Sequence, residues 1–163
     1  MNMQAQKMGF PPIYNENAKV LILGSFPSVK SREINFYYGN KQNRFWKMLC
    51  GYFQSEIPER NDEKRSFLLA NGIALWDIAT ACDIQGSADS SVKNVQIADL
   101  TPIFETTNLQ CILLNGTLAY TLFEKHYANC GIKYMKMPST SPANPRYNKQ
   151  AWTQALDGIY KTK

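Results

Sequence analysis

Short, continuous runs of apolar residues recur along this chain, separated by longer segments of mixed character. The clearest run is Val20–Gly24, and residues 73–76, 111–114 and 132–137 form three more. An apolar run bounded by turn residues is typical of a strand that is covered on both faces. We therefore predict four buried strands at these positions.

The segments between these runs carry helical signals. We expect helices from near residues 41–43 to Gly51, over residues 62–69, around residues 99–105, from Gly116 through Glu124, and from Tyr147 to about Tyr160. Strands that alternate with helices predict a mainly parallel sheet with helices on both faces. The fold class is therefore α/β: a three-layer α/β/α arrangement with a short, mainly parallel, four-stranded central sheet, in one domain over residues 1–163. Residues 85–91 are too polar for a core, and we expect a loop there.

The ends of the predicted strands indicate where a ligand would bind. They lead into residues 24–28, Asp77, residues 115–116 and residues 138–144, all of them polar or small. In open parallel sheets the ligand site lies at the carboxyl ends of the strands. We therefore expect these four segments to share one rim.

Residues 35–49 carry the most distinctive chemistry. Three consecutive aromatic residues at 36–38 lead into Asn40, Gln42, Asn43 and Arg44. Aromatic faces stack on flat rings, and amides read the hydrogen-bonding edges of such rings, so a nucleobase is a candidate ligand. The same spacing also fits an aromatic packing segment that leads into a helix, and Phe45 and Trp46 are expected to be core.

Charge and composition narrow the partner and the chemistry. The net charge of +5 and the pI of about 9.0 favour an acidic partner such as nucleic acid. The four cysteines form no CxxC pair, and neither a G-x-S-x-G elbow, a G-x-G-x-x-G turn nor a Walker loop is present. We expect no metal and no cofactor. Without a signal-like or membrane-length apolar run, we expect a soluble, cytoplasmic protein that makes no membrane contact.

Three ordered motifs make the chain resemble the uracil-DNA glycosylase superfamily. They are the turn Gly24-Ser25-Phe26-Pro27-Ser28 after the first strand, residues 36–46 with their Asn-Arg-Phe-Trp ending, and residues 137–144 after the last strand. The second motif is similar to the hypoxanthine-DNA (deoxyinosine) glycosylase branch. This resemblance implies a monofunctional DNA repair glycosylase, monomeric and without cofactors. It would hydrolyse the N-glycosidic bond of a flipped, deaminated base, deoxyinosine above all, and leave an abasic site.

Two positions depart from the pattern of the superfamily. Phe26 stands where several relatives carry Asp or Asn, and Met137 stands where relatives often carry His or Asn. A uracil or G:U/T mismatch-specific glycosylase therefore stays open as an alternative. So does a non-catalytic nucleic-acid-binding protein on the same scaffold.

The resemblance also implies roles for individual residues. Asn40 would orient the water or contact the leaving base, although it also fits a turn after Gly39. Tyr38 would stack on the flipped base, with Phe26 packing against the ring. Asp77 and Asn115 both remain candidates for reading the base edge. A carboxamide matches adjacent C=O and N–H groups, whereas a carboxylate matches only the N–H.

Short hydroxyl side chains, in loops whose backbone is restricted by proline, are expected to contact the DNA backbone. These are Ser28, Ser139 and Ser141, with Arg146 and Lys30 as phosphate partners. A solvent-exposed surface position explains either cation equally well. Lys41 would be the amine nucleophile of a strand-nicking enzyme, but a lysine at a helix start usually faces water, so we predict simple hydrolysis.

Overall fold

The computed structural model describes residues 7–83 and 93–161, and its centre is a parallel sheet. Strands β2 (Val20–Gly24), β3 (Ile73–Asp77), β6 (Cys111–Asn115) and β7 (Tyr134–Met137) pair in the order β3-β2-β6-β7. Every neighbouring pair is parallel. The four predicted strands are confirmed, with ends that differ by at most two residues.

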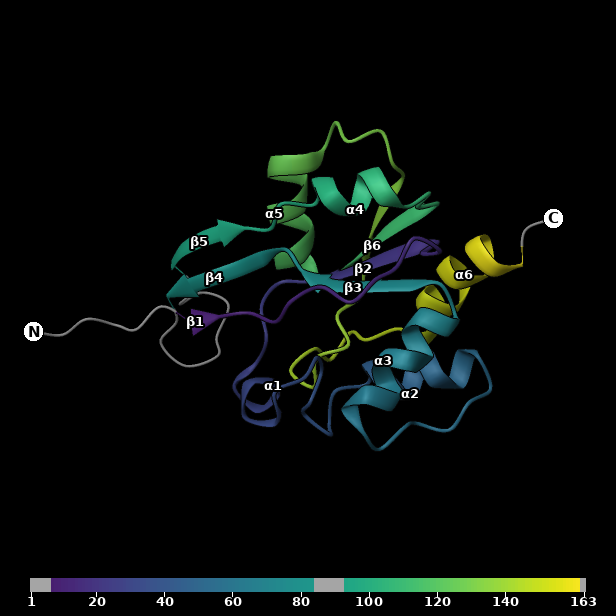
Figure 1. The fold of residues 1–163 in the computed structure, drawn as a ribbon. Coiled ribbons are helices and arrows are strands. Elements are labelled where there is room, and N and C mark those ends of the chain that lie inside the picture. The colour runs from purple at the N-terminus through teal and green to yellow at the C-terminus, as the bar shows by residue number, and fades with distance from the viewer. Residues whose placement is uncertain (1–6, 84–92, 162–163) are drawn as a thin grey trace, which may run out of the picture.

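Helices cover both faces of this sheet (Figure 1). Helices α2 (Phe45–Tyr52), α3 (Asn61–Ala70) and α6 (Lys149–Tyr160) lie on one face, and α4 (Thr101–Thr106) and α5 (Thr117–Tyr127) lie on the other. The side chains of β2 alternate between the two layers. Val20 and Ile22 belong to the core with α2 and α6, whereas Leu21 and Leu23 belong to the core with α5. The predicted three-layer α/β/α fold is confirmed.

A second, smaller sheet was not predicted. Strands β1 (Lys7–Met8), β4 (Ala79–Asp83) and β5 (Lys93–Ile97) pair antiparallel in the order β1-β4-β5. Helix α1 (Val29–Ile34) was missed as well. The sequences of β4 and β5 contain no continuous apolar run, and their pairing has register shifts, so no clean period marks them. The polar loop predicted at residues 85–91 lies outside the described residues.

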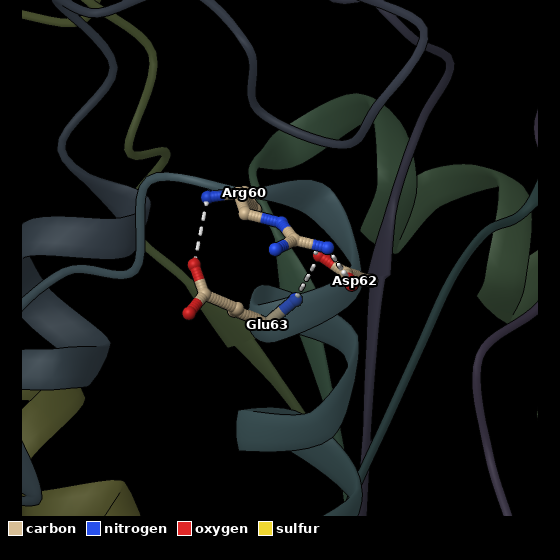
Figure 2. Close-up of polar contacts among 3 residues, drawn as sticks. All are labelled: Arg60, Asp62 and Glu63. Carbon is tan, nitrogen blue, oxygen red and sulfur yellow. Dashed lines mark hydrogen bonds and ion pairs between the residues drawn. The ribbon is translucent and has the colours of Figure 1, made fainter.

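The start of α3 shows why the predicted helix forms there (Figure 2). Glu63 Oε1 accepts a hydrogen bond from the backbone N–H of Arg60 at 3.3 Å, and Asp62 Oδ1 accepts from the backbone N–H of Glu63 at 3.0 Å. Both carboxylates lie at the positive end of the helix dipole. Beyond the other end, Gly72 adopts a φ of +70°, which favours glycine.

Helix α2 begins at Phe45, after the predicted start at residues 41–43. Two turns occupy the intervening residues. The backbone N–H of Asn43 donates to the carbonyl oxygen of Asn40 at 2.9 Å, and Asn43 Oδ1 accepts from the backbone N–H of Phe45 at 2.9 Å. The Asn43 side chain thus accepts a hydrogen bond from one of the backbone amides that a helix start leaves without a partner.

None of the helices in the described part of the chain has both the length and the apolar character needed to span a membrane.

Truncating Leu21 tests the assignment of the core. Leu21 lies within β2 and is 0% exposed, so Leu21→Ala is expected to lower the free energy of unfolding by about 3 kcal/mol in urea titrations. Ile57 is 46% exposed, and Ile57→Ala is expected to change that free energy by less than about 0.5 kcal/mol. Equal losses at the two positions would contradict this burial pattern.

Candidate active site

A cavity of about 430 Å³ opens at the carboxyl ends of the parallel strands. Its walls include residues 24–28 after β2, Asp77 at the end of β3, Asn115 and Gly116 at the end of β6, and residues 139–141 after β7. The predicted convergence of the four strand exits on one rim is therefore confirmed. The start of α5 also lines it, through residues 117–119.

Asn115 joins three parts of this cavity. Its Nδ2 donates to Tyr38 Oη at 3.1 Å and to Thr140 Oγ1 at 3.0 Å, and its Oδ1 accepts from the backbone N–H of Thr140 at 3.0 Å. An amide nitrogen carries two hydrogens, so both donors of the side chain are used inside the protein. Asn115 lines the cavity, and its bonds fix the positions of Tyr38 and of the loop after β7.

Arg44 holds the same loop from the other side. Its guanidinium donates to the carbonyl oxygens of Ser141 and, at 2.9 Å, of Asn144, and its carbon lies 4.3 Å from the centre of the Tyr147 ring. Its backbone N–H donates to the carbonyl oxygen of Thr140 at 3.1 Å. Charged donors to carbonyl groups make strong hydrogen bonds, so the loop after β7 is tied to the start of α2. This role of Arg44 was not predicted from the sequence.

Tyr38 is held in an unusual backbone conformation at the cavity wall. Its φ is +53°, a left-handed value that is uncommon for a residue other than glycine. Its ring stacks on Phe45, with ring centres 4.0 Å apart. Phe45 itself is 0% exposed and Trp46 is 5% exposed, so the prediction that both are core is confirmed.

Gly24 allows two polar groups to approach the end of β2. A Cβ atom at this position would lie 2.5 Å from Asp77 Oδ1 and 2.9 Å from Tyr38 Oη, closer than real Cβ contacts allow. The absence of a side chain therefore brings the Asp77 carboxyl and the Tyr38 hydroxyl to the same end of the cavity.

Asp77 is the most unusual side chain of the site. It is 4% exposed, and its Oδ2 is the one buried side-chain polar atom among the described residues without a hydrogen-bond partner. Burial raises the pKa of Asp77 to about 7, because removing a carboxylate from water disfavours its charged form. A substantial fraction of this carboxyl is therefore protonated at neutral pH.

The predicted phosphate-contacting residues divide into two groups. Ser28, Ser139 and Ser141 line the cavity, and each hydroxyl oxygen accepts a backbone N–H from its own turn. Lys30 and Arg146 do not line it. Lys30 is exposed and lies 3.7 Å from Glu33 on the surface, and Arg146 is also exposed.

The predicted catalytic residue Asn40 lies outside this cavity. It lines a neighbouring cavity of about 700 Å³, which shares Tyr38 and Asn43 with the first. Its Oδ1 accepts the backbone N–H of Gln42 at 2.9 Å, the bond expected of a turn residue. The structure thus brings together Phe26, Tyr38, Asp77 and Asn115 around one cavity, whereas Asn40 lines the neighbouring one.

The two positions that depart from the superfamily pattern differ in their surroundings. Met137 is 2% exposed and packs in the core with α2 and α6, so it lies within the protein rather than on the cavity wall. Phe26 does line the cavity, with the Arg32 guanidinium carbon 5.8 Å from its ring centre. Asn43, from the amide-rich segment singled out in the sequence, also lines the cavity, as do Thr117 and Thr140, which were not singled out because Thr residues carry no distinctive pattern.

No group of three or more His, Cys, Asp or Glu side chains with the arrangement of metal ligands occurs within residues 7–83 and 93–161. The expectation that no metal or cofactor is needed stays a prediction. Cys111, within β6, is buried.

Comparisons with known proteins find related sequences and a related structure. Residues 11–157 match the model of the uracil DNA glycosylase superfamily. The chain is 35% identical to the hypoxanthine DNA glycosylase of Methanosarcina acetivorans, over 88% of this chain and 91% of that protein. It is 32% identical to the hypoxanthine DNA glycosylase of Methanosarcina barkeri, over 93% of this chain and 98% of that protein. A solution NMR structure of a candidate uracil DNA glycosylase from Methanosarcina acetivorans superposes with a TM-score of 0.84 at 31% identity, and it covers 95% of this chain and 99% of that one.

Removing the guanidinium of Arg44 is expected to loosen the loop after β7. Arg44→Met removes its side-chain hydrogen bonds to Ser141 and Asn144, which should cost about 1–3 kcal/mol of stability and speed hydrogen exchange at residues 140–144. Lys47→Met, on the exposed face of α2, is the matched control and should leave this exchange unchanged. Unchanged exchange in the Arg44 variant would contradict the role given to the guanidinium.

The raised pKa of Asp77 predicts a pH dependence of stability. Well below pH 4 both the folded and the unfolded state hold the proton, so the group causes no change of stability with pH. Between about pH 4 and 7 the unfolded state releases its proton first, so stability falls as pH rises and then levels off. Asp77→Asn removes this effect. The free energy of unfolding of the variant minus that of the wild type, both measured in urea, should therefore increase by a few kcal/mol as the pH rises from 4 to 7. A difference that stays constant with pH would contradict the raised pKa.

Proposed function

Because this chain belongs to the uracil DNA glycosylase superfamily and is a DNA glycosylase, we propose that it removes hypoxanthine from deoxyinosine in DNA. The observation that carries the choice of base is the pair of hypoxanthine DNA glycosylases similar to this chain over 88% and 93% of its length. The cavity at the strand ends supports it. Its volume of about 430 Å³ is in the range of sites that enclose small, flat ligands.

The proposed reaction is hydrolysis at one bond. The bond from C1′ of the deoxyribose to N9 of the base breaks, and the oxygen of one water molecule forms a new bond to C1′. One proton of that water ends on the departing hypoxanthine, and the abasic sugar keeps the hydroxyl. Positive charge develops on the sugar and negative charge on the base, so the protein must hold the base, donate hydrogen bonds to it and place the water.

The nucleotide must leave the duplex for this reaction, because C1′ is inaccessible inside the base stack. We place the extruded base in the cavity against Tyr38 and Phe26. The stacking of Tyr38 on Phe45 and its hydrogen bond from Asn115 support a fixed ring position in advance of binding. Such prior ordering lowers the entropy lost when the base is held.

Flanking phosphates would lie over the rim. Ser28, Ser139 and Ser141 supply hydroxyl groups there, and the first turn of α5 supplies backbone N–H groups at the positive end of its dipole. Lys30 and Arg146, outside the cavity, would contact phosphates farther along the strand. The net charge of +5 favours this approach to DNA.

Asn40 is proposed to orient the water at the mouth of the site. It lines the neighbouring cavity, which shares Tyr38 and Asn43 with the main one, and the sugar of an extruded nucleotide would lie there beside the base. In the described part of the chain no lysine lines the main cavity, and Lys41 lines the neighbouring one, which supports a monofunctional hydrolase. A cytoplasmic monomer that acts as one domain over residues 1–163 completes the proposal.

Base release from defined oligonucleotides tests the function. With EDTA present, the purified protein is expected to release hypoxanthine from a deoxyinosine duplex and to leave abasic sites that break only after alkali. Release of uracil from a deoxyuridine duplex in place of hypoxanthine would retain the superfamily and overturn the proposed base. Strand breaks without alkali or heat would contradict simple hydrolysis.

Two variants of Asn40 separate catalysis from turn formation. Asn40→Ser keeps an oxygen that can accept from Gln42 but removes the carboxamide, and Asn40→Ala removes both. If Asn40 orients the water, both variants should lose about 100-fold in single-turnover rate while their melting temperatures stay near that of the wild type. Full activity in Asn40→Ser would show that Asn40 only forms the turn.

A further inference from the structure

The Asp77 carboxyl combines three features that call for a ligand. It is 4% exposed, its Oδ2 has no hydrogen-bond partner, and it lines the cavity at the end of β3. A buried polar atom without a partner costs free energy, so a native structure that keeps one needs a reason. A bound group that hydrogen bonds to this carboxyl would supply that reason.

Within residues 7–83 and 93–161, no cation is found beside this carboxyl. The titratable groups near it are the hydroxyls of Tyr37 and Tyr38, and burial raises the pKa of both, so they are uncharged at neutral pH. Gly24 of β2 and Asn115 of β6 are the other strand-end residues at this rim, and neither carries charge. None of the ion pairs among the described residues includes Asp77. A carboxylate here would have neither water nor a counter-charge, so the uncharged acid is favoured in the empty site at pH values below about 7.

We propose that Asp77 reads the base as an uncharged carboxylic acid, an inference that rests on the proposed function. Its hydroxyl donates to the 6-oxo group of hypoxanthine, and its carbonyl oxygen accepts from the adjacent N1–H. An acid in this form offers one donor and one acceptor side by side, which matches the edge of a base with neighbouring C=O and N–H groups. The proton stays on Asp77, and no covalent bond to the carboxyl forms or breaks.

The same protonation state suits the chemistry. As the C1′–N9 bond breaks, negative charge spreads over the departing base, including its 6-oxo oxygen. A carboxylate at this edge would repel that charge inside a buried site, whereas a hydroxyl donor stabilises it. Asp77 is then both a specificity-determining and a catalytic residue, because its hydrogen bond strengthens in the transition state.

Asn115 is less suited to this task. Both hydrogens of its Nδ2 are already donated, to Tyr38 and Thr140, and its Oδ1 accepts from Thr140. Reading the base with Asn115 would require breaking these bonds, whereas Asp77 Oδ2 has none to lose. Asn115 instead fixes the tyrosine beside which the base would lie.

The inference is tested by measuring the single-turnover rate of hypoxanthine release from a deoxyinosine duplex between pH 5.5 and 9. The wild type, Asp77→Asn and Asp77→Ala are compared. The carboxamide keeps one donor and one acceptor at every pH. We expect the wild-type rate to fall toward tenfold per pH unit once Asp77 loses its proton. Asp77→Asn should stay within about tenfold of the wild type at pH 6 and be independent of pH, whereas Asp77→Ala should lose about 100-fold.

The opposite pattern would overturn the inference. A wild-type rate that rises through the same pH range, with Asp77→Asn as inactive as Asp77→Ala, would make Asp77 a carboxylate that activates water. Full activity in Asp77→Ala would show that the base is not read by this residue. If the wild type releases no hypoxanthine at any pH, the proposed function fails. If it does, and only the profile differs, this inference alone fails.

A spectroscopic measurement keeps the test independent of the variants' folding. Protein labelled with carbon-13 at the aspartate carboxyls is titrated by NMR, free and with DNA that carries 2′-fluoro-deoxyinosine, in which the glycosidic bond resists hydrolysis. The Asp77 resonance is assigned by its absence from Asp77→Asn, or by sequential correlation if that variant does not fold. It should keep the shift of a protonated acid at pH 7 in the complex. A carboxylate shift at pH 5 would overturn the inference.

Discussion

The Asn115 carboxamide lies at the carboxyl end of β6. Both of its N–H donors and its oxygen acceptor form hydrogen bonds with residues that are distant in sequence. It binds the Tyr38 hydroxyl on one side and Thr140 on the other, so three chain segments meet at one side chain. These hydrogen bonds fix the positions of Tyr38 and of the loop after β7 at the cavity wall. Arg44 reinforces the arrangement, since it ties the loop after β7 to the start of α2. The polar network therefore stabilises the shape of the site as well as the fold.

The parallel sheet supplies the rest of the geometry. Because β2, β3, β6 and β7 run in the same direction, all four end at one rim, and the residues that follow them line one cavity. The missing side chain of Gly24 lets Asp77 and Tyr38 approach the end of β2. An aromatic ring and a buried, unpartnered carboxyl are thereby placed at the same end of a cavity. In a DNA glycosylase this arrangement suits a flat base that is read along one edge.

Much of this could be read from the sequence, because buried parallel strands are continuous apolar runs and their ends must converge. The residue roles that were not predicted from the sequence depend on contacts with distant partners, which no local sequence pattern reveals. Arg44 binds the carbonyl oxygens of Ser141 and Asn144, far along the chain, and any residue type presents a carbonyl. Strands β4 and β5 lack an apolar run, so they were missed. The role of Asn40 stays a prediction, because the structure places it in a turn beside the neighbouring cavity.

The structure of the protein bound to a duplex that contains 2′-fluoro-deoxyinosine would test the central claim most directly. The account predicts that hypoxanthine lies outside the duplex, in the cavity lined by Phe26, Tyr38 and Asp77, with its N1 and 6-oxo edge within hydrogen-bonding distance of the Asp77 carboxyl. Its sugar should lie toward Asn40. A base that stays stacked in the duplex, or one that enters the cavity beside Asn40 and Lys47 instead, would contradict the account.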